Sequence, residues 1–232
     1  MDKLSDIIKK IKPLERVQRE SYAYNMNEEL QIIIAIGLNI TSNFFIDSSN
    51  EFVYKNLIKY FLGDKTIECI RPTDIDRKIT GGDLNKGIYI GGNPGSGKSL
   101  CMEIFNQYTK LRGIQYTKGI ETLPFTFTNF RADDIVDDFC KTGSFDRYKY
   151  RYVLSIQDFG AESTESYYMG NKYNVLKKII EYRGDLSNVF TFITSNLQIQ
   201  GQKLLDLYGD RVQSRLLGMC NYYTLTGLDK RR

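Results

Sequence analysis

The strongest constraint on the fold of this chain is an eight-residue segment, residues 92–99, which reads Gly-Asn-Pro-Gly-Ser-Gly-Lys-Ser. It follows the apolar run at residues 87–91, which has the character of a buried strand, and precedes residues 100–105, which have helical character. The pattern G-x-x-x-x-G-K-S between a strand and a helix is typical of a phosphate-binding loop. The segment therefore predicts one strand-loop-helix unit with an anion site at its turn.

The residue types of this loop suit a triphosphate and Mg²⁺. Glycines allow backbone turns that point successive N–H groups inward, beside the partial positive charge of a helix N-terminus. We expect Lys98 to reach the β- and γ-phosphates and the Ser99 hydroxyl to bind Mg²⁺. The predicted nucleotide-binding residues are Gly92, Asn93, Pro94, Gly95, Ser96, Gly97, Lys98, Ser99 and Leu100.

Beyond residue 86, apolar runs alternate with helical patterns. This alternation implies crossover connections, and hence an α/β fold with a mainly parallel sheet covered by helices on both faces. Ligands gather at the carboxyl ends of the strands in such sheets. The predicted strands are 87–91, 123–129, 151–157, 189–195 and 220–226, and the predicted helices are 97–112, 131–140, 170–183 and residues around 200–217.

The first part of the chain predicts a small helical module. Apolar residues recur at helical spacing in residues 4–11, residues 30–36 fit one or more short helices, and residues 50–62 fit an amphipathic helix that packs against the nucleotide domain. Residues 64–86 are more polar. We therefore expect residues 1–63 to form an N-terminal module and residues 64–232 to form the nucleotide-binding domain.

Length, charge and cysteine usage exclude several classes of protein. The 232 residues suffice for one α/β domain and a small module. The 32 basic and 28 acidic residues leave a net charge of +4, so any DNA contact must come from local clustering. Four scattered cysteines and no histidine argue against zinc. The absence of a signal-peptide core and of a long apolar span predicts a cytoplasmic protein without a membrane partner.

The predicted strand at residues 151–157 ends in Gln157 and Asp158, the position at which Walker B strands deliver acidic side chains. Most such strands end in two acids, one for the Mg²⁺ shell and one for the attacking water. Here an amide precedes the single acid, and an amide lacks the charge that holds a hard cation. The predicted metal residues are Ser99, Gln157 and Asp158, and we expect slow hydrolysis. A buried strand that ends in an arbitrary acid is the simpler alternative.

The following strand ends in Thr194, Ser195 and Asn196. A short polar side chain at this place can position water against a γ-phosphate. Taken alone, the three residues also fit a strand-ending turn or a helix N-cap. Their place in the order of motifs favours the functional interpretation for Asn196.

Taken together, these motifs resemble the AAA+ ATPases of the replicative helicase loader type, DnaC and DnaI, and their transposition relatives of the IstB type. The resemblance covers about residues 84–232. It rests on the segments 83–87, 92–99, 157–162, 194–196, 209–216 and 225–231.

The resemblance implies roles for further residues. Asn196 is similar to the first sensor, and Arg215, with Arg211 one turn earlier, stands where the family carries an arginine that reaches the nucleotide of a neighbouring subunit. An i,i+4 pair on a solvated helix face is the alternative for these arginines. Arg231 resembles a terminal second sensor and joins the nucleotide-binding residues. The predicted catalytic set is Lys98, Asp158, Asn196, Arg211 and Arg215.

The function that the resemblance implies is an ATPase, with ATP and Mg²⁺ as cofactors, that loads a replicative hexameric DNA helicase onto single-stranded DNA. It also implies a homo-oligomer with nucleotide at subunit interfaces, and helicase docking through helices within residues 1–62. Two alternatives stay open. One is an IstB-like ATPase that acts on duplex DNA with a transposase. The other, favoured by Gln157, is a nucleotide-gated DNA- or protein-binding module with little ATP turnover.

Two segments are candidate DNA contacts. Residues 145–152 interleave cations with aromatic rings, a combination that binds phosphates and stacks on bases in single strands. The same period-two alternation also fits a half-exposed strand edge, which is the simpler interpretation. Residues 162–173 hold Tyr167, Tyr168, Lys172 and Tyr173.

Overall fold

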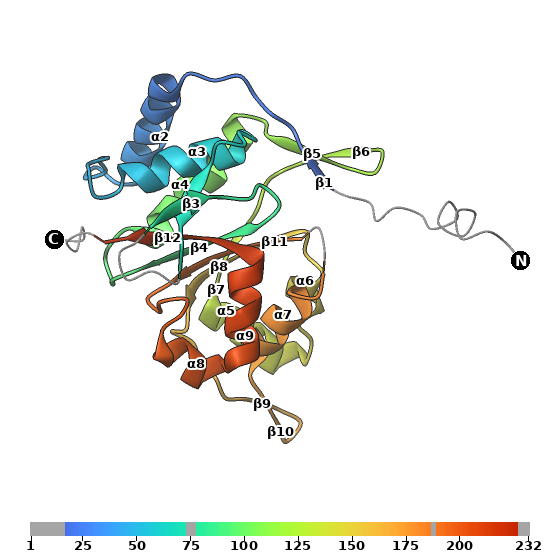
Figure 1. Cartoon of the computed structure of the whole chain (residues 1–232). Coiled ribbons are helices and arrows are strands. Elements are labelled where there is room, and N and C mark those ends of the chain that lie inside the picture. Colours follow the sequence, from blue (N-terminus) through green and yellow to red (C-terminus); the bar gives the residue numbers. More distant parts are fainter. Residues whose placement is uncertain (1–16, 73–77, 187–188, 227–232) are drawn as a thin grey trace, which may run out of the picture.

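The structure is a computed structural model that describes residues 17–72, 78–186 and 189–226 (Figure 1). Within these ranges a central sheet has the strand order β12-β4-β11-β8-β7, and every neighbouring pair is parallel. This confirms the predicted α/β fold with a parallel sheet. The strands are β4 (Gly87–Gly92), β7 (Asn129–Arg131), β8 (Val153–Phe159), β11 (Phe190–Ser195) and β12 (Cys220–Leu225).

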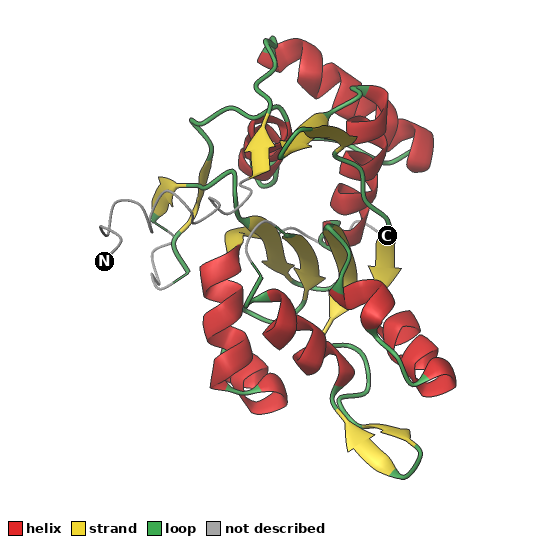
Figure 2. Cartoon of the chain, turned by 90° about the vertical axis from the view of Figure 1, so that its right-hand side faces the viewer, coloured by secondary structure: helices red, strands yellow, loops and turns green. Residues whose placement is uncertain are grey.

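Helices cover both faces of this sheet (Figures 1 and 2). One face carries α2 (Met26–Ile40), α3 (Glu51–Phe61) and α4 (Lys98–Leu111). The other carries α5 (Ala132–Thr142), α6 (Asp146–Lys149), α7 (Val175–Arg183), α8 (Gln202–Tyr208) and α9 (Asp210–Met219). In the part of the chain that the structure describes, no helix combines the length and the apolar character needed to cross a bilayer.

The strands separate two hydrophobic clusters. Ile88 and Ile90 of β4 pack into the cluster beneath α2, α3 and α4, whereas Tyr89 packs into the cluster on the opposite face. In β11, Phe192 and Ile193 divide between the two clusters in the same way. Successive side chains of a strand point to opposite faces, so a sheet buried on both faces requires uninterrupted apolar runs. This requirement is why the sequence revealed these strands.

The N-terminal helices pack onto α4 and the central sheet. The ring of Phe61 in α3 lies 5.2 Å from that of Phe105 in α4 and 5.8 Å from that of Phe192 in the sheet. The Tyr60 hydroxyl donates to the carbonyl of Lys86 over 2.7 Å. Residues 26–40, which include the predicted helical segment 30–36, form a single helix of 15 residues. The helical pattern at residues 4–11 lies outside the described residues.

The predicted strand at residues 123–129 is wrong. Residues 121–124 belong to β6 (Glu121–Pro124), which pairs with β5 (Gln115–Lys118), and β5 in turn pairs with β1 (Val17–Arg19) in a separate antiparallel sheet. The central sheet receives only β7 from this region. Pro124 has no N–H to donate to a central strand. Phe125 and Phe127 are buried in a connection that packs on the first cluster, so their apolar character reports burial and not strand pairing.

Two antiparallel hairpins also lie outside the predicted pattern: β2 (Glu68–Ile70) with β3 (Ile79–Gly81), and β9 (Ser166–Tyr168) with β10 (Asn171–Tyr173). The second hairpin shortens the helix predicted at residues 170–183. Gly170 turns the chain with φ +79°, and the Asn174 side chain caps α7 by accepting from the backbone N–H of Lys177 over 3.0 Å. The helix therefore begins at Val175.

The strand-edge interpretation of residues 145–152 is also wrong, because residues 146–149 form the short helix α6. The Phe145 carbonyl accepts from the backbone N–H groups of both Tyr148 and Lys149 over 3.0 Å. Tyr148 is buried and its hydroxyl donates to Asp138 over 2.9 Å. Alternation over only a few residues does not distinguish a strand from a turn of helix when the neighbouring aromatic rings pack inward.

Candidate nucleotide-binding site

The segment at residues 92–99 connects β4 to α4 in the predicted strand-loop-helix order. Gly92 has φ +154°, and a Cβ atom there would lie 2.0 Å from the carbonyl oxygen of Leu225. Gly97 precedes the first residue of α4 with φ +87°, a left-handed conformation that favours glycine. These two positions show why the loop needs glycine at its start and at its junction with the helix.

Lys98 spans this loop from the first turn of α4. Its ammonium donates to the carbonyl oxygens of Gly92 and Asn93 over 3.0 and 2.8 Å, and to the side-chain oxygen of Asn196 over 2.8 Å. The side chain is buried. These oxygen atoms hold the ammonium at the mouth of the loop, where an anionic phosphate oxygen would be a stronger acceptor than they are.

The three residues predicted to hold metal lie together. The Ser99 hydroxyl is 3.5 Å from a carboxylate oxygen of Asp158, and the Gln157 amide nitrogen donates to the Ser99 carbonyl over 3.4 Å. Asp158 has φ +58°, and its backbone N–H donates to the Thr194 hydroxyl over 3.1 Å. A hydroxyl and a carboxylate at this separation fit the all-oxygen, water-rich coordination of Mg²⁺. The amide of Gln157 points its donor nitrogen at backbone instead.

The end of β11 completes this edge of the sheet. The Ser195 hydroxyl donates to the carbonyl of Phe159 over 2.5 Å and accepts from the backbone N–H of Leu197 over 3.0 Å. These bonds tie the turn after β11 to the turn after β8. Asn196 follows directly and meets Lys98, so the structure brings together the lysine, the acid and the predicted sensor.

A cavity of about 590 Å³ opens at this edge. The site residues predicted from the sequence that line it are Pro94, Gly95, Gly97, Lys98, Ser99, Leu100, Asp158 and Asn196. Four further residues line it that sequence reasoning missed, namely Thr41, Asn43, Phe44 and Arg131. The cavity has the size and the mixed polar and apolar lining of a small-molecule site.

The missed residues come from two places. Thr41, Asn43 and Phe44 belong to the connection between α2 and α3, which carries no motif. Arg131 is the last residue of β7, and its guanidinium lies 3.4 Å from the carboxylate of Asp158 while it makes two 3.0 Å hydrogen bonds to Asp133. Those hydrogen bonds lower the pKa of the Asp133 carboxyl. The sequence could have indicated Arg131 as a site residue, because it ends a parallel strand. It did not do so because that strand was predicted at residues 123–129.

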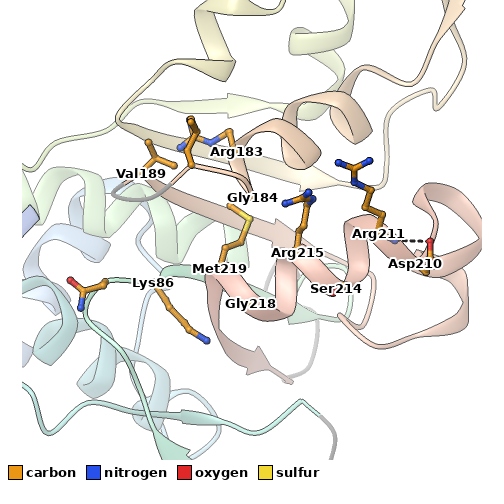
Figure 3. A pocket seen from close by; sticks show the side chains of 12 residues that line it. Lys86, Arg183, Gly184, Val189, Asp210, Arg211, Ser214, Arg215, Gly218 and Met219 are labelled. Atoms are coloured by element: carbon orange, nitrogen blue, oxygen red, sulfur yellow. Dashed lines mark hydrogen bonds between the residues drawn. The ribbon is translucent and has the colours of Figure 1, made fainter. Parts of the chain in front are cut away.

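Arg211 and Arg215 lie in a different cavity of about 990 Å³ (Figure 3). It is also lined by Lys86 and Val189, which precede β4 and β11, so it opens at the amino ends of the strands. No lining residue is common to the two cavities. The described part of the chain therefore does not bring these arginines to its own phosphate loop. Arg231 lies outside the described residues.

Arg183, a residue that sequence reasoning did not single out, is fully buried beside the second cavity. Its guanidinium donates to the carbonyls of Arg151 and Phe190 over 2.6 and 2.7 Å and to the Thr191 hydroxyl over 2.9 Å. Burial lowers the pKa of Arg183 to about 10. Because these partners are neutral, the arginine acts as a hydrogen-bonding anchor that joins the end of α7 to β11 and to the segment after α6.

No protein-family model matches this chain, and no curated protein matches it. The solved structures that are similar to it include the following two. AMPPCP-bound DnaA from Aquifex aeolicus is 19% identical with a TM-score of 0.47, over 79% of this chain and 49% of that one, so this chain spans about half of that DnaA chain. The DnaC helicase loader is 15% identical with a TM-score of 0.49, over 80% of this chain and 95% of that one. The strand order and the loop geometry themselves make this chain an α/β phosphate-loop protein.

Proposed function

We propose that this chain is an ATPase that works in an oligomer to load a replicative DNA helicase onto single-stranded DNA. The observation that carries the nucleotide part is the convergence of Lys98, Ser99, Asp158 and Asn196 on one cavity at the carboxyl ends of β4, β8 and β11. The loader part is supported by the ordered set of motifs and by their resemblance to the DnaC and DnaI type.

In this proposal, different residues of the chain bind the phosphates, the metal ion and the attacking water. Backbone N–H groups of residues 95–99 and the Lys98 ammonium bind phosphate oxygens, and Ser99 with Asp158 would hold Mg²⁺. When bound, Mg²⁺ would neutralise charge on the β- and γ-phosphates. Asn196 reaches the same region from β11 and is placed to orient a water molecule.

Slow turnover is part of this proposal. Asp158 is the only carboxylate among the described residues that line the cavity, so it must serve both the metal and the attacking water. Gln157 contributes a donor to backbone and no negative charge. A single acid in both roles supports hydrolysis at a reduced rate.

The position of the arginines supports an oligomer. Arg211 and Arg215 sit at the amino ends of the strands, remote from the chain's own loop, and planar guanidinium groups suit the charge that develops on a transferring phosphoryl group. We therefore assign them to the nucleotide of a neighbouring copy. Arg215→Ala should leave ATP binding intact and reduce turnover by about 10³-fold, the lower end of the effect of such arginines.

Residues 1–63 are the part we assign to helicase docking. Leu38, Ile40 and Phe45 are exposed at and just beyond the end of α2. These large apolar side chains are exposed close together along the chain, and we base the docking assignment on them. The exposed Arg147 of α6 and the exposed Tyr150 that follows this helix mark a second surface, which we assign to DNA.

The test is reconstitution with a candidate hexameric helicase encoded near this chain. Purified protein, helicase, ATP and circular single-stranded DNA are combined, and helicase bound to the circle is measured. We expect loading that requires ATP and intact Lys98. An absence of both complex formation and stimulated loading would overturn the loader assignment. Binding of the chain to duplex DNA alone would favour the transposition-type alternative.

One observation favours a second candidate, a nucleotide-gated binding module. Gln157 stands where a second acid would promote hydrolysis, so ATP would control assembly without being consumed. Nucleotide-dependent assembly with no phosphate release over many hours would select this candidate over the ATPase.

A further inference from the structure

The two arginines that line the second cavity form ion pairs with Asp185, a residue that the sequence motifs did not include. Asp185, which follows α7 by two residues, has one carboxylate oxygen 2.6 Å from Nη1 of Arg215 and the other 3.9 Å from Nη2 of Arg211. Both arginines project from the same side of α9 (Figure 3). One carboxylate thus faces two guanidinium groups.

Asp185 lies in a hydrogen-bonded turn at the end of α7. The preceding helix ends at Arg183, whose guanidinium is fixed by hydrogen bonds to the carbonyls of Arg151 and Phe190. Backbone N–H groups of Asp185 and Leu186 donate to the carbonyls of Tyr182 and Arg183 over 3.1 Å, which closes a turn. The backbone of Asp185 is therefore held next to the buried Arg183.

Gly184, in the same turn, leaves room for the side chain of Arg215. A Cβ atom at this position would lie 2.6 Å from Cδ and 2.8 Å from Cγ of Arg215, so only glycine lets the arginine stem cross here. The Arg215 side chain is 19% exposed, and its Nε has no hydrogen-bond partner among the described residues. The aliphatic part of the Arg215 side chain is therefore packed, while its Nε–H group donates to no described residue.

Arg211 and Arg215 are one helical turn apart, and like charges at this spacing repel. A carboxylate between them offsets this repulsion. Asp185 and Arg211 are both about 60% exposed, and exposed ion pairs are weak. Asp185 can therefore orient the guanidinium groups without outcompeting a polyanion. Asp185 contacts Arg215 through Nη1, which leaves Nη2 of the guanidinium for a ligand.

We propose that Asp185 is a positioning residue that aims Arg215, and with it Arg211, at a phosphate oxygen of the triphosphate held by a second copy of this chain. This inference rests on the proposed function, because it assigns a further residue to the shared nucleotide site. Asp185 acts through the arginines and does not touch the nucleotide.

Mixed oligomers separate this role from a general effect on folding. Lys98→Ala subunits cannot hold ATP but offer intact arginines, whereas Arg215→Ala subunits hold ATP but lack the arginine. An equimolar mixture should recover ATP turnover that neither variant shows alone. Asp185→Asn is then placed in one partner at a time.

We expect Asp185→Asn in the Lys98→Ala subunit to lower the recovered kcat about tenfold without changing KM, the scale of a misplaced catalytic group. The same change in the Arg215→Ala subunit should have no effect, because its partner arginine is absent. Asp185→Glu should retain most of the turnover, and Gly184→Ala in the Lys98→Ala subunit should reduce it by displacing the Arg215 stem. Asp137→Asn, which removes an exposed acid of α5, is the matched control.

The outcomes are distinguishable. If wild-type protein hydrolyses ATP but the two parent variants do not complement, the shared site fails, and the inference fails with it. If they complement and Asp185→Asn acts equally in both subunits, or in neither, the positioning role is overturned while the shared site stands. If wild-type protein shows no turnover, the proposed ATPase itself is rejected.

Discussion

Lys98 donates a 2.8 Å hydrogen bond to the side-chain oxygen of Asn196, which joins the first turn of α4 to the residue after β11. The two residues are 98 positions apart in sequence, and the parallel pairing of β4 with β11 brings them together. The same lysine also donates to the carbonyls of Gly92 and Asn93. An anionic phosphate oxygen at this site would be a stronger acceptor for the lysine than these carbonyl and amide oxygens.

Replacing Lys98 by alanine should abolish measurable ATP binding. Hydrogen bonds to charged groups contribute about 1.5–3 kcal/mol each, so losing contacts to two phosphates weakens binding by at least about 100-fold. Isothermal titration calorimetry with ATP and Mg²⁺ measures this loss. Lys110→Ala, an exposed lysine near the other end of α4, is the matched control and should bind as wild type does. Equal affinities for the two variants would remove the loop from the nucleotide site.

Asn196→Ala should reduce kcat by about 10²-fold, the scale of removing one positioned polar group, and change the Kd for ATP little. Asn196→Asp should weaken ATP binding as well, because a carboxylate beside Lys98 repels the phosphates. Single-turnover hydrolysis and fluorescent-nucleotide titration separate the two effects. Unchanged turnover in the alanine variant would argue that Asn196 only fixes the lysine.

Gln157→Asp should increase turnover. The change supplies the second acid that β8 lacks, close to Ser99 and beside Asp158, so one carboxylate can bind the metal while the other polarises water. We expect at least about a tenfold increase in phosphate release, equivalent to about 1.4 kcal/mol of barrier. Gln157→Asn keeps an amide and is the control. A decrease in the aspartate variant would show that the amide contact to the Ser99 carbonyl matters more than charge.

Sequence reasoning recovered the parts of this fold that a local pattern encodes. The runs of β4, β8 and β11 are apolar because both faces of the sheet are buried, and the loop at residues 92–99 has its own spacing. Because parallel strands bring their carboxyl ends to one edge of a sheet, the motif order alone predicts that Lys98, Asp158 and Asn196 lie close together. All three line the same cavity.

Other parts depend on contacts that no local pattern carries. Arg131 reaches Asp158 only because β7 ends beside β8. The sequence predicted this strand several residues too early, because the buried rings of Phe125 and Phe127 give the preceding segment an apolar character. The connection at residues 41–44 lines the cavity through the packing of α2 on α4. Arg183 has a charge that predicts exposure, yet its hydrogen bonds to backbone carbonyls keep it inside.

Arg183→Met should lower the free energy of unfolding by about 3 kcal/mol or more. Methionine matches the stem of arginine but leaves the carbonyls of Arg151 and Phe190 and the Thr191 hydroxyl without their donor, and an unsatisfied buried group costs about 1–3 kcal/mol. Urea unfolding followed by circular dichroism measures the change. Arg147→Met, at an exposed site on α6, should cost less than about 1 kcal/mol. A loss below that value at position 183 would contradict the anchoring role.

Glu162→Gln should flatten the pH dependence of stability. Glu162 follows β8 and accepts hydrogen bonds from the Tyr208 hydroxyl and from the backbone N–H of Gly160. Burial raises the pKa of this carboxyl above its ordinary value of 4.5, and the charge of Asp133 adds to the shift, although both hydrogen bonds oppose it.

The sign follows from proton linkage. A carboxyl whose pKa is higher in the folded state stabilises the fold below its unfolded pKa of about 4.5, and this contribution is lost as the pH rises through the folded pKa. Glutamine keeps an acceptor for Tyr208 without titrating. The free energy of unfolding of the variant should therefore rise relative to wild type between pH 4.5 and neutrality, as measured by urea titrations across that range. Glu165→Gln, an exposed change three residues away, serves as the comparison. Parallel curves for wild type and Glu162→Gln would show that burial of the Glu162 carboxyl has no energetic cost.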